Sequence, residues 1–352
     1  MSSSLYSLRW EEGELVLLDQ TKLPGTITYI RCSTCEQVAE AIKVLAVRGA
    51  PAIGVAAAYG MVLALRQGLS RNLKGKELAG FFDEEGRKLN EARPTAVNLS
   101  WAVKVMMDLF HHTEEGSALS VLTEKAMAME EEDKRLCDSM ADNGARLFEG
   151  RNHLRILTHC NTGALATCGI GTAFGVIYRL HERGQIDCIY ADETRPLLQG
   201  ARLTGTELMA NHIPCRLISD NMAAYVMAHE HIDAVMVGAD RIASNGDSAN
   251  KIGTYGLSIL AAYHHIPFYI VAPFSTFDFS ISSGKEIKIE ERNPEEVRSF
   301  HGVYDAPKDI PVLNPAFDVA PHELITGIIT EKGVLTPPYD AAIKKYERSL
   351  QL

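Results

Sequence analysis

Apolar and polar positions repeat with different periods along the chain, and the changes of period divide it into three stretches. In the first forty residues, short apolar runs at 14–18 and 26–30 flank a Pro-Gly turn and predict a small β region. From about residue 35 to 149, apolar residues recur three or four positions apart, which is typical of amphipathic helices. From residue 154 onward, short apolar runs alternate with helical stretches. The chain is therefore expected to begin with a mainly helical part and to continue as an α/β part.

The alternation in the second half predicts a parallel sheet, because parallel strands need a crossover connection that is usually a helix. The predicted fold class is α/β, with a C-terminal Rossmann-like parallel sheet covered by helices on both faces. A smaller, mainly helical N-terminal domain with the short β region precedes it. The expected strands are 154–158, 186–190, 215–219, 232–238 and 267–272, and the expected helices are 164–183, 198–211, one that ends near 229, and 250–264.

The same pattern predicts the domain organisation. Residues 1–129 are expected to form the N-terminal domain, 130–149 a linking helix, and 150–352 the Rossmann-like α/β domain, which is the candidate catalytic domain. The charge run from Glu130 to Arg135 falls in a helical pattern and indicates a solvated helix face between the domains. In open parallel sheets, ligands bind beyond the carboxyl ends of the strands. Residues that follow the predicted strands are therefore the first candidates for chemistry.

Composition narrows the class of protein. Of the 352 residues, 46% are hydrophobic and 23% are charged, as in globular proteins, and the formal net charge is −10. An acidic chain has no general attraction to nucleic acid or to anionic membranes, so neither is expected as a partner. The runs without charged residues at 49–65, 156–178 and 252–277 are too short or are broken by polar residues, and buried core segments fit them better than membrane spans. No signal peptide is visible at the start, and the expected location is cytoplasmic.

The cysteines and histidines do not indicate a disulfide framework or a metal site. Seven cysteines are an odd number spread over a long chain, which indicates reduced thiols. Cys32 and Cys35 form a CxxC pair without a second pair at zinc-finger spacing, so buried thiols are favoured over redox or metal use. Two histidine pairs lack carboxylate or cysteine partners at metal spacing, and no metal is predicted; they are His229 with His231 and His264 with His265.

Cys160 ends the strand-like run that starts at Arg155, and a predicted helix follows it. A sulfur near a helix N-terminus lies in a partial positive charge that favours the thiolate, which can transfer protons or attack an electrophile. A structural thiol in a turn is the alternative interpretation. The neighbouring His159 is not expected to pair with Cys160 directly, because adjacent strand residues point to opposite faces.

Asp240 ends the strand-like run 234–240 in the same way. The preceding residues are apolar, so this carboxyl group is expected to be partly desolvated, with a raised pKa that suits a general acid or base near neutral pH. A cap for the following segment is the alternative. Two proton-carrying groups at the carboxyl ends of one parallel sheet indicate a single crevice.

An anion has two candidate sites. In the polar loop 238–255, Asn250, Lys251 and the free N–H groups of the following helix are suited to hold one. In the segment from Arg48 to Gly54, small residues admit a close backbone approach ahead of a helix, and Arg48 and Arg93 are natural phosphate partners. Surface salt bridges are the alternative for either arginine.

Six segments together resemble the methylthioribose-1-phosphate isomerases of methionine salvage, within a wider family that includes the regulatory subunits of the eukaryotic initiation factor two exchange factor. They span nearly the whole chain, and Cys160 together with Asp240 is the more selective combination within the wider family. The segments are VRGAPAIG (47–54), RPTAVNLSW (93–101), HCNTGALAT (159–167), ETRPLLQGARLT (193–204), GADRIASNGDSANKIGTY (238–255) and NPAFD (314–318).

The resemblance implies an aldose-ketose isomerase that converts 5-methylthioribose 1-phosphate into 5-methylthioribulose 1-phosphate. It implies that Cys160 and Asp240 are catalytic, and that a further set of residues binds the sugar phosphate. It also implies a homodimer, and the chemistry calls for no cofactor. The implied substrate-binding residues are Arg48, Gly49, Ala50, Arg93, Gln199, Asn250 and Lys251.

Several alternatives stay open. The substrate could be another phosphorylated pentose, such as ribose 1,5-bisphosphate or 5-deoxyribose 1-phosphate, or the chain could be a non-catalytic regulatory subunit of the same fold. Within the isomerase, Asp240 is expected to act as the acid/base at an oxygen while Cys160 handles the other migrating proton, but the roles could be exchanged. A hydride shift in a dry pocket is the alternative to proton transfer through an enediolate.

Overall fold

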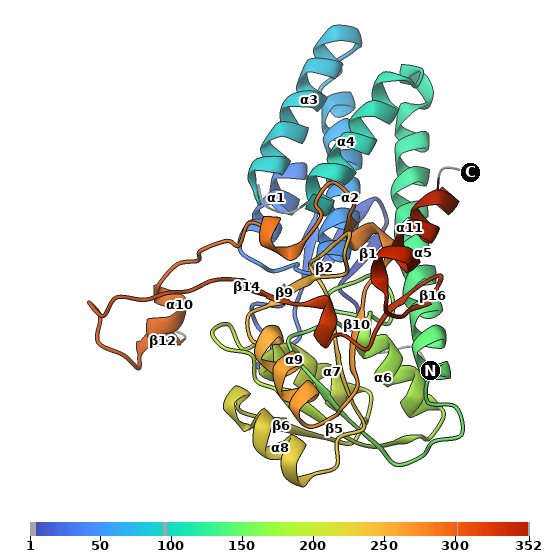
Figure 1. Ribbon diagram of the computed structural model, residues 1–352. Coiled ribbons are helices and arrows are strands. Elements are labelled where there is room, and N and C mark those ends of the chain that lie inside the picture. The colour runs from blue at the N-terminus through green and yellow to red at the C-terminus, as the bar shows by residue number, and fades with distance from the viewer. Residues whose placement is uncertain (1–4, 94–96, 301, 351–352) are drawn as a thin grey trace. The chain divides into compact units, whose positions relative to one another are not determined.

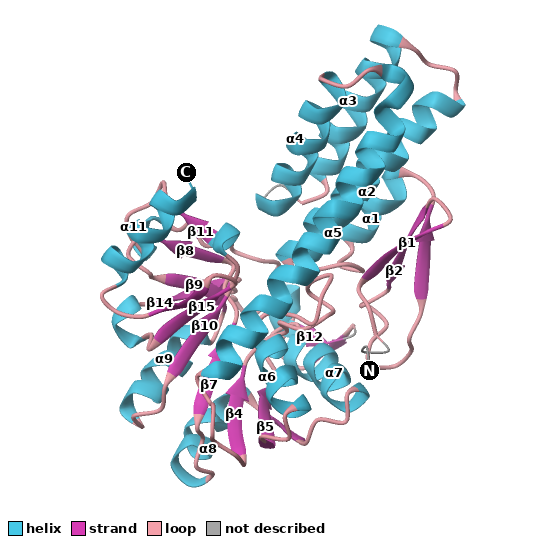
Figure 2. Cartoon of the chain, turned by 90° about the vertical axis from the view of Figure 1, so that its right-hand side faces the viewer, coloured by secondary structure: helices cyan, strands magenta, loops and turns pink. Residues whose placement is uncertain are grey.

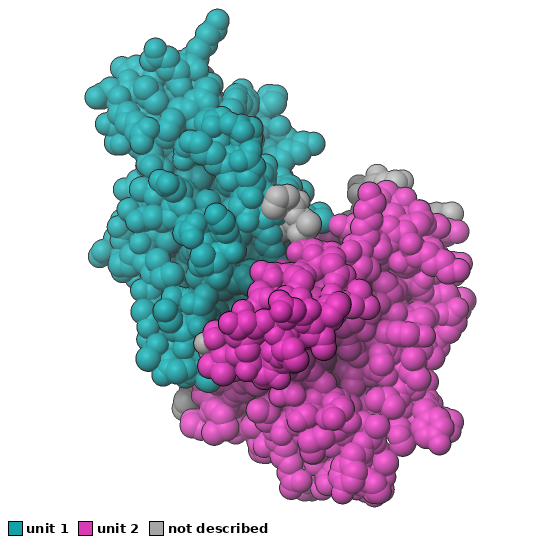
Figure 3. All heavy atoms as spheres, turned by 90° about the vertical axis from the view of Figure 1, so that its left-hand side faces the viewer, with its two compact units in different colours: residues 1–136, 163–171 teal, residues 137–162, 172–352 magenta. Residues whose placement is uncertain are grey.

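The computed structural model describes residues 5–93, 97–300 and 302–350. It divides into two compact units, which are coloured separately in Figure 3: unit 1 comprises residues 1–136 and 163–171, and unit 2 comprises residues 137–162 and 172–352. The chain therefore leaves unit 2 after Thr162, contributes a short segment to unit 1 and returns at Thr172.

The predicted linking segment 130–149 falls largely on one long helix, α5 (Glu115–Arg146), which continues across the change from unit 1 to unit 2 after Leu136. The predicted domain boundaries at 129 and 150 themselves stay a prediction. One of the segments that carry the resemblance, 93–101, is described only in part, because Pro94 to Ala96 lie outside the described residues.

The β region of unit 1 is a three-stranded antiparallel sheet in the order β1-β2-β3. The strand predicted at 14–18 is confirmed as β2 (Glu14–Leu18). The strand predicted at 26–30 is displaced to β3 (Tyr29–Cys32), because Thr26 still belongs to the turn, where its N–H donates to the carbonyl of Lys22. The sequence does not predict β1 (Leu8–Glu11), since its charged residues obscure the apolar alternation.

Helices fill the rest of unit 1, as the apolar spacing predicts. The first begins after Thr34, whose hydroxyl accepts a hydrogen bond from the N–H of Gln37 in a capping box. At the centre lies α2, which packs against α1, α3 and α4. Besides α5, the helices are α1 (Cys35–Lys43), α2 (Ala50–Ser70), α3 (Gly75–Glu91) and α4 (Val97–His111).

The helix α2 is apolar on nearly all sides. By length and composition it could cross a membrane, but 83% of its apolar window is buried inside the protein. A helix that is hydrophobic all round is typical of a protein core when its faces are covered in this way. The expectation that the charge-free run 49–65 is a core segment is therefore confirmed.

The CxxC cysteines also belong to this core. Cys32 and Cys35 are fully buried, and burial raises their pKa to about 11 and about 12. Their thiols are therefore protonated at neutral pH and inert, because the thiolate is the reactive form. This burial supports the interpretation of the pair as core residues.

Gly49, which precedes α2, explains why the segment 163–171 is part of unit 1. Its φ of +88° lies in the left-handed region that favours glycine, and a Cβ at this position would lie 2.3 Å from the carbonyl oxygen of Ala166. The N–H of Ala52, in the first turn of α2, donates to the same carbonyl at 3.3 Å. Only glycine allows the two backbones to approach so closely.

Asp133 is a buried carboxyl group on α5. It is 8% exposed, and its Oδ2 accepts a hydrogen bond from the backbone N–H of Cys168 at 2.6 Å. Burial raises the pKa of Asp133 to about 6, and the bond from Cys168 offsets this only in part. The folded protein therefore binds a proton at this position more tightly than the unfolded chain does.

Stabilisation by protonated Asp133 is expected to be lost as the pH rises from about 4 to about 6. The substitution Asp133→Asn keeps an acceptor for Cys168 and cannot ionise. It should therefore raise the free energy of unfolding near pH 7.5 by about 1–3 kcal/mol and change it little near pH 4. Urea unfolding at both pH values measures this, with the exposed Glu131→Gln on the same helix as the control. An equal gain at both pH values would contradict the ionisation argument.

Unit 2 is built on a seven-stranded sheet in the order β16-β15-β10-β7-β4-β5-β6, in which only β16 runs antiparallel to its neighbour; Figure 2 shows the strands from β15 to β5. Each strand predicted from 154 onward is present within two residues of its predicted ends, and β4 matches its prediction at both. The strands are β4 (Leu154–Thr158), β5 (Ile186–Asp192), β6 (Cys215–Ile218), β7 (Ala234–Val237), β10 (Phe268–Val271), β15 (Gly327–Thr330) and β16 (Gly333–Leu335).

Helices cover both faces of this sheet, as predicted. In Figure 2, α6 and α7 lie on one side of the strands, and α8 and α9 lie on the other. A π-helical turn, Gly200–Thr204, leads into α7. The helices are α6 (Ala173–Glu182), α7 (Gly205–Ala210), α8 (Ala223–His229), α9 (Thr254–Tyr263) and α11 (Tyr339–Leu350).

Two of the predicted helices begin earlier in the sequence than the observed helices do. The helix expected at 164–183 begins only at Ala173, because residues 163–171 leave the sheet domain for unit 1. The helix expected at 250–264 begins at Thr254, because Asn250 and Lys251 belong to a strand. That strand is part of a small four-stranded sheet in the order β11-β8-β9-β14, with bounds β8 (Arg241–Ala243), β9 (Ser248–Lys251), β11 (Phe277–Asp278) and β14 (Phe317–Ala320).

An arm of unit 2 extends between β11 and β14 and is seen at the left of Figure 1. It contains α10 (Glu295–Arg298) and the short hairpin of β12 (Ser299–Phe300) and β13 (Val303–Tyr304). Asn314 fixes its base, since its buried side chain donates to the carbonyl of Asn293 and to Glu296. The NPAFD segment therefore has a structural role at its first residue.

Candidate active site

Cys160 and Asp240 follow two neighbouring strands, β4 and β7. In chain order the parallel strands are β4, β5, β6, β7, β10 and β15, and their order across the sheet, β6-β5-β4-β7-β10-β15, is that of dinucleotide-binding Rossmann folds. The direction of winding reverses between β4 and β7. Ligands in such sheets bind outside the carboxyl ends of the strands at this switch point. Both residues therefore lie at the edge, and beside the two strands, where the fold favours a site.

The backbone of Cys160 is held in an unusual conformation. Its φ of +63° is left-handed, which is uncommon for a residue with a side chain. Two threonine hydroxyl groups hold it there: the Cys160 N–H donates to Thr194 Oγ1 at 2.9 Å, and the Cys160 carbonyl accepts from Thr204 Oγ1 at 2.6 Å. Cys160 is 6% exposed. Such strain at a buried cysteine is typical of functional sites.

The helix that the sequence places directly after Cys160 begins later than predicted. The next helix of the chain, α6, begins only at Ala173, after the excursion into unit 1. Its start nevertheless returns to the Cys160 turn, because the N–H groups of Thr172 and Phe174 donate to the carbonyl and to Oγ1 of Thr162 at 2.8 and 3.1 Å. Activation of the Cys160 thiol by this helix N-terminus stays a prediction.

Asp240 lies three residues beyond β7, and its N–H donates to the carbonyl of Ala249 at 2.8 Å. This bond continues into the hairpin of β8 and β9. The side chain is exposed, so the expectation of partial desolvation is wrong for the structure as described. Burial of the apolar strand does not extend to Asp240, because the chain has already turned out of the sheet.

His159 and Asp192 form a buried pair beside Cys160. His159 Nδ1 lies 2.9 Å from Asp192 Oδ2, and His159 Nε2 lies 2.9 Å from the carbonyl oxygen of Ile252. Both side chains are 1% exposed. Burial lowers the pKa of His159, but the hydrogen bond and the negative charge of Asp192, together with the Ile252 carbonyl and Asp220, outweigh it and the net shift is upward. With both ring nitrogens bonded elsewhere, His159 does not pair with Cys160, as the sequence predicts.

Gln199 is buried in the loop between β5 and α7. Its Oε1 has no hydrogen-bond partner among the residues that the structure describes. The loop itself is fixed by Asp220, whose carboxylate accepts the N–H groups of Thr194 and Arg195 at 2.7 Å each. A buried amide oxygen without a partner costs free energy, and a ligand hydroxyl group would satisfy it.

Asn250 and Lys251 end β9. The Asn250 side chain donates to Thr254 Oγ1 at 3.0 Å, and Lys251 Nζ donates to the carbonyl of Ala316 at 2.8 Å. Lys251 Nζ also lies over the ring of Phe317, 4.8 Å from its centroid. These contacts fix the positions of the amide and the ammonium group.

The N-terminus of α9 is not free to hold an anion, contrary to the prediction. Asp318 accepts hydrogen bonds from the N–H groups of Gly253 at 2.8 Å and of Tyr255 at 3.0 Å. Burial raises the pKa of Asp318 despite these bonds. The last residue of the NPAFD segment therefore caps the helix at which the sequence predicts an anion.

The other predicted substrate residues, Arg48, Gly49, Ala50 and Arg93, belong to unit 1. Arg48, Gly49 and Ala50 stand at the start of α2, and Arg93 follows α3; all four are half-buried. Gly49 has a demonstrated structural requirement through its approach to Ala166. Binding of substrate by these residues stays a prediction.

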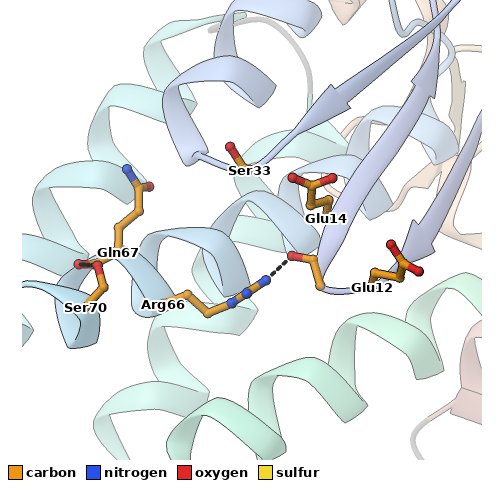
Figure 4. Close-up of a pocket in the computed structure, with 7 residues that line it drawn as sticks. Glu12, Glu14, Ser33, Arg66, Gln67 and Ser70 are labelled. Carbon is orange, nitrogen blue, oxygen red and sulfur yellow. Dashed lines mark hydrogen bonds between the residues drawn. The ribbon is translucent and has the colours of Figure 1, made fainter.

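A polar pocket of about 490 Å³ lies elsewhere in unit 1 (Figure 4). It is formed between the turn of β1 and β2 and the end of α2, and Arg66 donates to the carbonyl of Gly13 at its edge. No residue predicted to bind or react lines it; the lining residues are Glu12, Gly13, Glu14, Ser33, Arg66, Gln67 and Ser70.

Two groups of side chains have the composition of metal ligands. In the first, ligand atoms of His159, Asp192 and Asp220 lie within 4.8 Å of one another, and in the second those of Asp247, His322 and Glu323 do. Hydrogen bonds within the protein account for both groups: His159 uses both nitrogens, and Asp247 accepts from His322, Asn245 and Gly284. Neither geometry requires a metal.

The sequence could have revealed more of this site. Asp192 is the last residue of β5, close to the site as Cys160 and Asp240 are, but the predicted strand stops at residue 190. Thr194 and Asp220 carry no local signal, because they act through backbone bonds to distant residues.

The fold and the residues at the switch point define the class: a Rossmann-like α/β protein with ionisable groups where such folds bind small molecules. The model of the Initiation factor 2 subunit family matches residues 46–337. The chain belongs to this family.

Relatives across nearly the whole chain are sugar-phosphate isomerases. The Methylthioribose-1-phosphate isomerase of Pelotomaculum thermopropionicum is 52% identical over 97% of this chain and 94% of its own length. The 5-deoxyribose 1-phosphate isomerase of Moorella thermoacetica is 49% identical over 98% of each.

Solved structures of high similarity carry two kinds of name. The crystal structure of 5-methylthioribose 1-phosphate isomerase from Pyrococcus horikoshii matches with a TM-score of 0.92 and 42% identity, covering 99% of this chain and 97% of that one. The structure of translation initiation factor eIF-2B, subunit delta, from A. fulgidus matches with a TM-score of 0.87 and 41% identity, covering 97% of this chain and 100% of that one.

Proposed function

We propose that this protein is the isomerase that converts 5-methylthioribose 1-phosphate into 5-methylthioribulose 1-phosphate in methionine salvage. The observation that carries the proposal is the identity of about half of all residues, over nearly the full length, with enzymes of that name. The placement of Cys160 and Asp240 after neighbouring strands at the switch point supports it.

The reaction needs groups that move protons. The substrate carries phosphate on its anomeric carbon, so its ring cannot open by loss of a hydroxyl proton at that carbon. In the net change, one hydrogen moves from carbon 2 to carbon 1, the hydroxyl at carbon 2 loses its proton as the carbonyl forms, and the ring oxygen gains a proton. Asp240 acts as the acid/base at oxygen, and Cys160 takes or stabilises the hydrogen between the carbons. Exchange of the two roles, and a hydride shift, are the competing schemes.

Two alternative functions rest on particular relatives. The Moorella thermoacetica enzyme favours 5-deoxyribose 1-phosphate as a second candidate substrate, which differs only at carbon 5. The A. fulgidus structure favours a regulatory subunit. Ribose 1,5-bisphosphate is the third candidate substrate, and it would require basic residues around carbon 5.

The remaining parts of the proposal concern binding and assembly. Arg48, Gly49, Ala50, Arg93, Gln199, Asn250 and Lys251 bind the substrate, no cofactor takes part, and the protein is cytoplasmic. A homodimer is expected, and exposed apolar residues on α9 at a spacing of four, Tyr255, Ile259 and Tyr263, suit contact with a second copy. Analytical ultracentrifugation tests the dimer, and a monomer at micromolar concentration would contradict it.

Proton NMR in deuterium oxide is the test of the function. The purified protein is expected to convert 5-methylthioribose 1-phosphate to the ketose with a higher kcat/KM than 5-deoxyribose 1-phosphate or ribose 1,5-bisphosphate. Deuterium at carbon 1 of the product supports the enediolate route, and its absence supports a hydride shift. Folded protein that turns over none of the three sugars would exclude the isomerase and favour the regulatory role. A higher kcat/KM with either of the other two sugars would identify that sugar as the substrate instead.

A further inference from the structure

We propose that His159 and Asp192 are positioning residues that hold the Cys160 turn and the Asn250–Lys251 segment in one geometry. The role rests on the proposed function, because these two segments carry three of its expected site residues, Cys160, Asn250 and Lys251. Neither His159 nor Asp192 is expected to touch the substrate.

The imidazole ring joins three segments that are distant in sequence. His159 directly follows β4, its Nδ1 is bonded to Asp192 at the end of β5, and its Nε2 is bonded to the carbonyl of Ile252, between β9 and α9. The ring also packs against Gly253, where a Cβ would lie 2.9 Å from His159 Cε1. The contact therefore needs glycine at 253, where φ is +108°.

The neighbours of these anchored atoms are the candidate site residues. Cys160 is the next residue after His159, and Lys251 is the residue before Ile252. If the ring were displaced, the peptide group before Cys160 and the carbonyl group of Ile252 after Lys251 would both move. Asp192 extends the link, because its own carbonyl accepts from Thr194 Oγ1 at 3.2 Å, and that oxygen accepts from the Cys160 N–H.

Hydrogen-bond roles fix the protonation of the ring at one nitrogen. The Ile252 carbonyl can only accept, so Nε2 carries a hydrogen. The second nitrogen, Nδ1, either donates to ionised Asp192 or accepts from the protonated carboxyl group of Asp192. Acidic side chains on neighbouring elements, Asp220 and Asp318, favour the positive ring. In both forms the contacts to Asp192 and Ile252 persist, so the geometry does not depend on the charge.

The substitution Asp192→Asn distinguishes the positioning of the His159 ring from the effect of the Asp192 negative charge. Its amide group can donate to Nδ1 of a neutral His159 while Nε2 still donates to Ile252, so Asp192→Asn keeps the ring in place without a carboxylate. Asp192→Ala leaves Nδ1 without its partner, and His159→Ala removes the ring and the link to Ile252.

Kinetics with 5-methylthioribose 1-phosphate on the full chain test the proposal. His159→Ala and Asp192→Ala are expected to lower kcat by about 100-fold and to raise KM, because both a reacting group and binding groups are displaced. Asp192→Asn is expected to recover most of the loss in both constants. Equal losses in Asp192→Asn and Asp192→Ala would overturn the positioning role in favour of a charge effect, and unchanged kinetics in His159→Ala would overturn it altogether.

Gln185→Ala is the matched control for lost stability. Gln185 is also buried in unit 2 and donates to the carbonyls of Phe148 and Arg151 at 2.9 and 2.7 Å, at the opposite end of the sheet. It should cost comparable stability in urea unfolding and leave kcat and KM unchanged. A loss of activity as large as that of His159→Ala would assign the effect to general destabilisation and overturn the proposal.

A second readout does not depend on turnover. The rate at which iodoacetamide alkylates Cys160, followed on its peptide by mass spectrometry, should rise in His159→Ala and Asp192→Ala relative to wild type and Asp192→Asn, while the rate at Cys215 stays constant. If wild type turns over no sugar phosphate, the proposed function fails, and this rate still decides whether the pair holds the Cys160 turn. An unchanged rate at Cys160 in both alanine variants would overturn the proposal.

Discussion

The Asp240→Asn protein is expected to fold normally and to convert 5-methylthioribose 1-phosphate with a kcat lowered by about 10²–10⁴-fold. An amide cannot take up and release a proton near neutral pH, and general acid–base catalysis contributes a factor of this size. Because the Asp240 side chain is exposed, the substitution buries no unsatisfied group, so the free energy of unfolding should change little. Initial rates by NMR and a thermal melt measure the two quantities.

Cys160→Ser should show a loss of similar size for a different reason. The turn at residue 160 is held through its backbone by Thr194 and Thr204, so serine keeps the geometry. A serine hydroxyl is a far weaker acid than a thiol and is not ionised near neutral pH. The control for both variants is Asp187→Asn, which removes a half-buried carboxylate bonded to Arg155 away from the switch point. Wild-type rates in Asp240→Asn would remove Asp240 from the mechanism.

Gly200→Ala is expected to destabilise unit 2 by about 3 kcal/mol and to abolish most activity. A Cβ on Gly200 would lie 1.7 Å from the carbonyl oxygen of Asp192 and 2.8 Å from Thr194 Oγ1. Neither neighbour can give way, because the first is backbone and the second holds the Cys160 turn. The π-helical turn that begins at Gly200 must therefore shift, and Gln199 must shift with it. Urea unfolding and initial rates measure both losses.

Gly256→Ala serves as the comparison for that substitution. Gly256 is an exposed residue of α9, and a Cβ added to it would meet no heavy atom of the described residues within 4 Å beyond its own stretch of helix. Alanine should therefore be neutral there or stabilise by up to about 1 kcal/mol. If Gly200→Ala were as stable as Gly256→Ala, the close approach of Gly200 to Asp192 would not be a constraint on the fold.

Local patterns predict the sheet of unit 2 well for a physical reason. Buried strands such as β4 and β7 are mainly apolar, and turn residues precede or follow them, so their ends can be predicted from short stretches of sequence. The starts of α6 and α9 cannot be read in this way. Residues 163–171 belong to a charge-free run that continues into the helix, but they pack beside the start of α2 at Gly49. Asn250 and Lys251 pair with β14, which comes more than sixty residues later.

The candidate site, like the fold, can be predicted from the sequence only in part. That Cys160 and Asp240 follow strands within two or three residues is a local property, and the sequence predicts it. That their strands are neighbours depends on the order in which the crossovers place β4 and β7. The exposure of Asp240 depends on where the following hairpin directs the chain. The hydrogen bonds of His159 depend on three strand ends that meet in space. These strand ends are far apart along the chain, so no short stretch of sequence predicts the contacts.

The return of residues 163–171 to unit 1 means that neither unit is encoded by one uninterrupted stretch of the gene. A fragment ending at residue 136 would lack the carbonyl of Ala166 that α2 requires at its first turn, and a fragment starting at 137 would carry nine residues whose packing partners are missing. Recombination therefore cannot exchange one unit between members of the family by a single crossover.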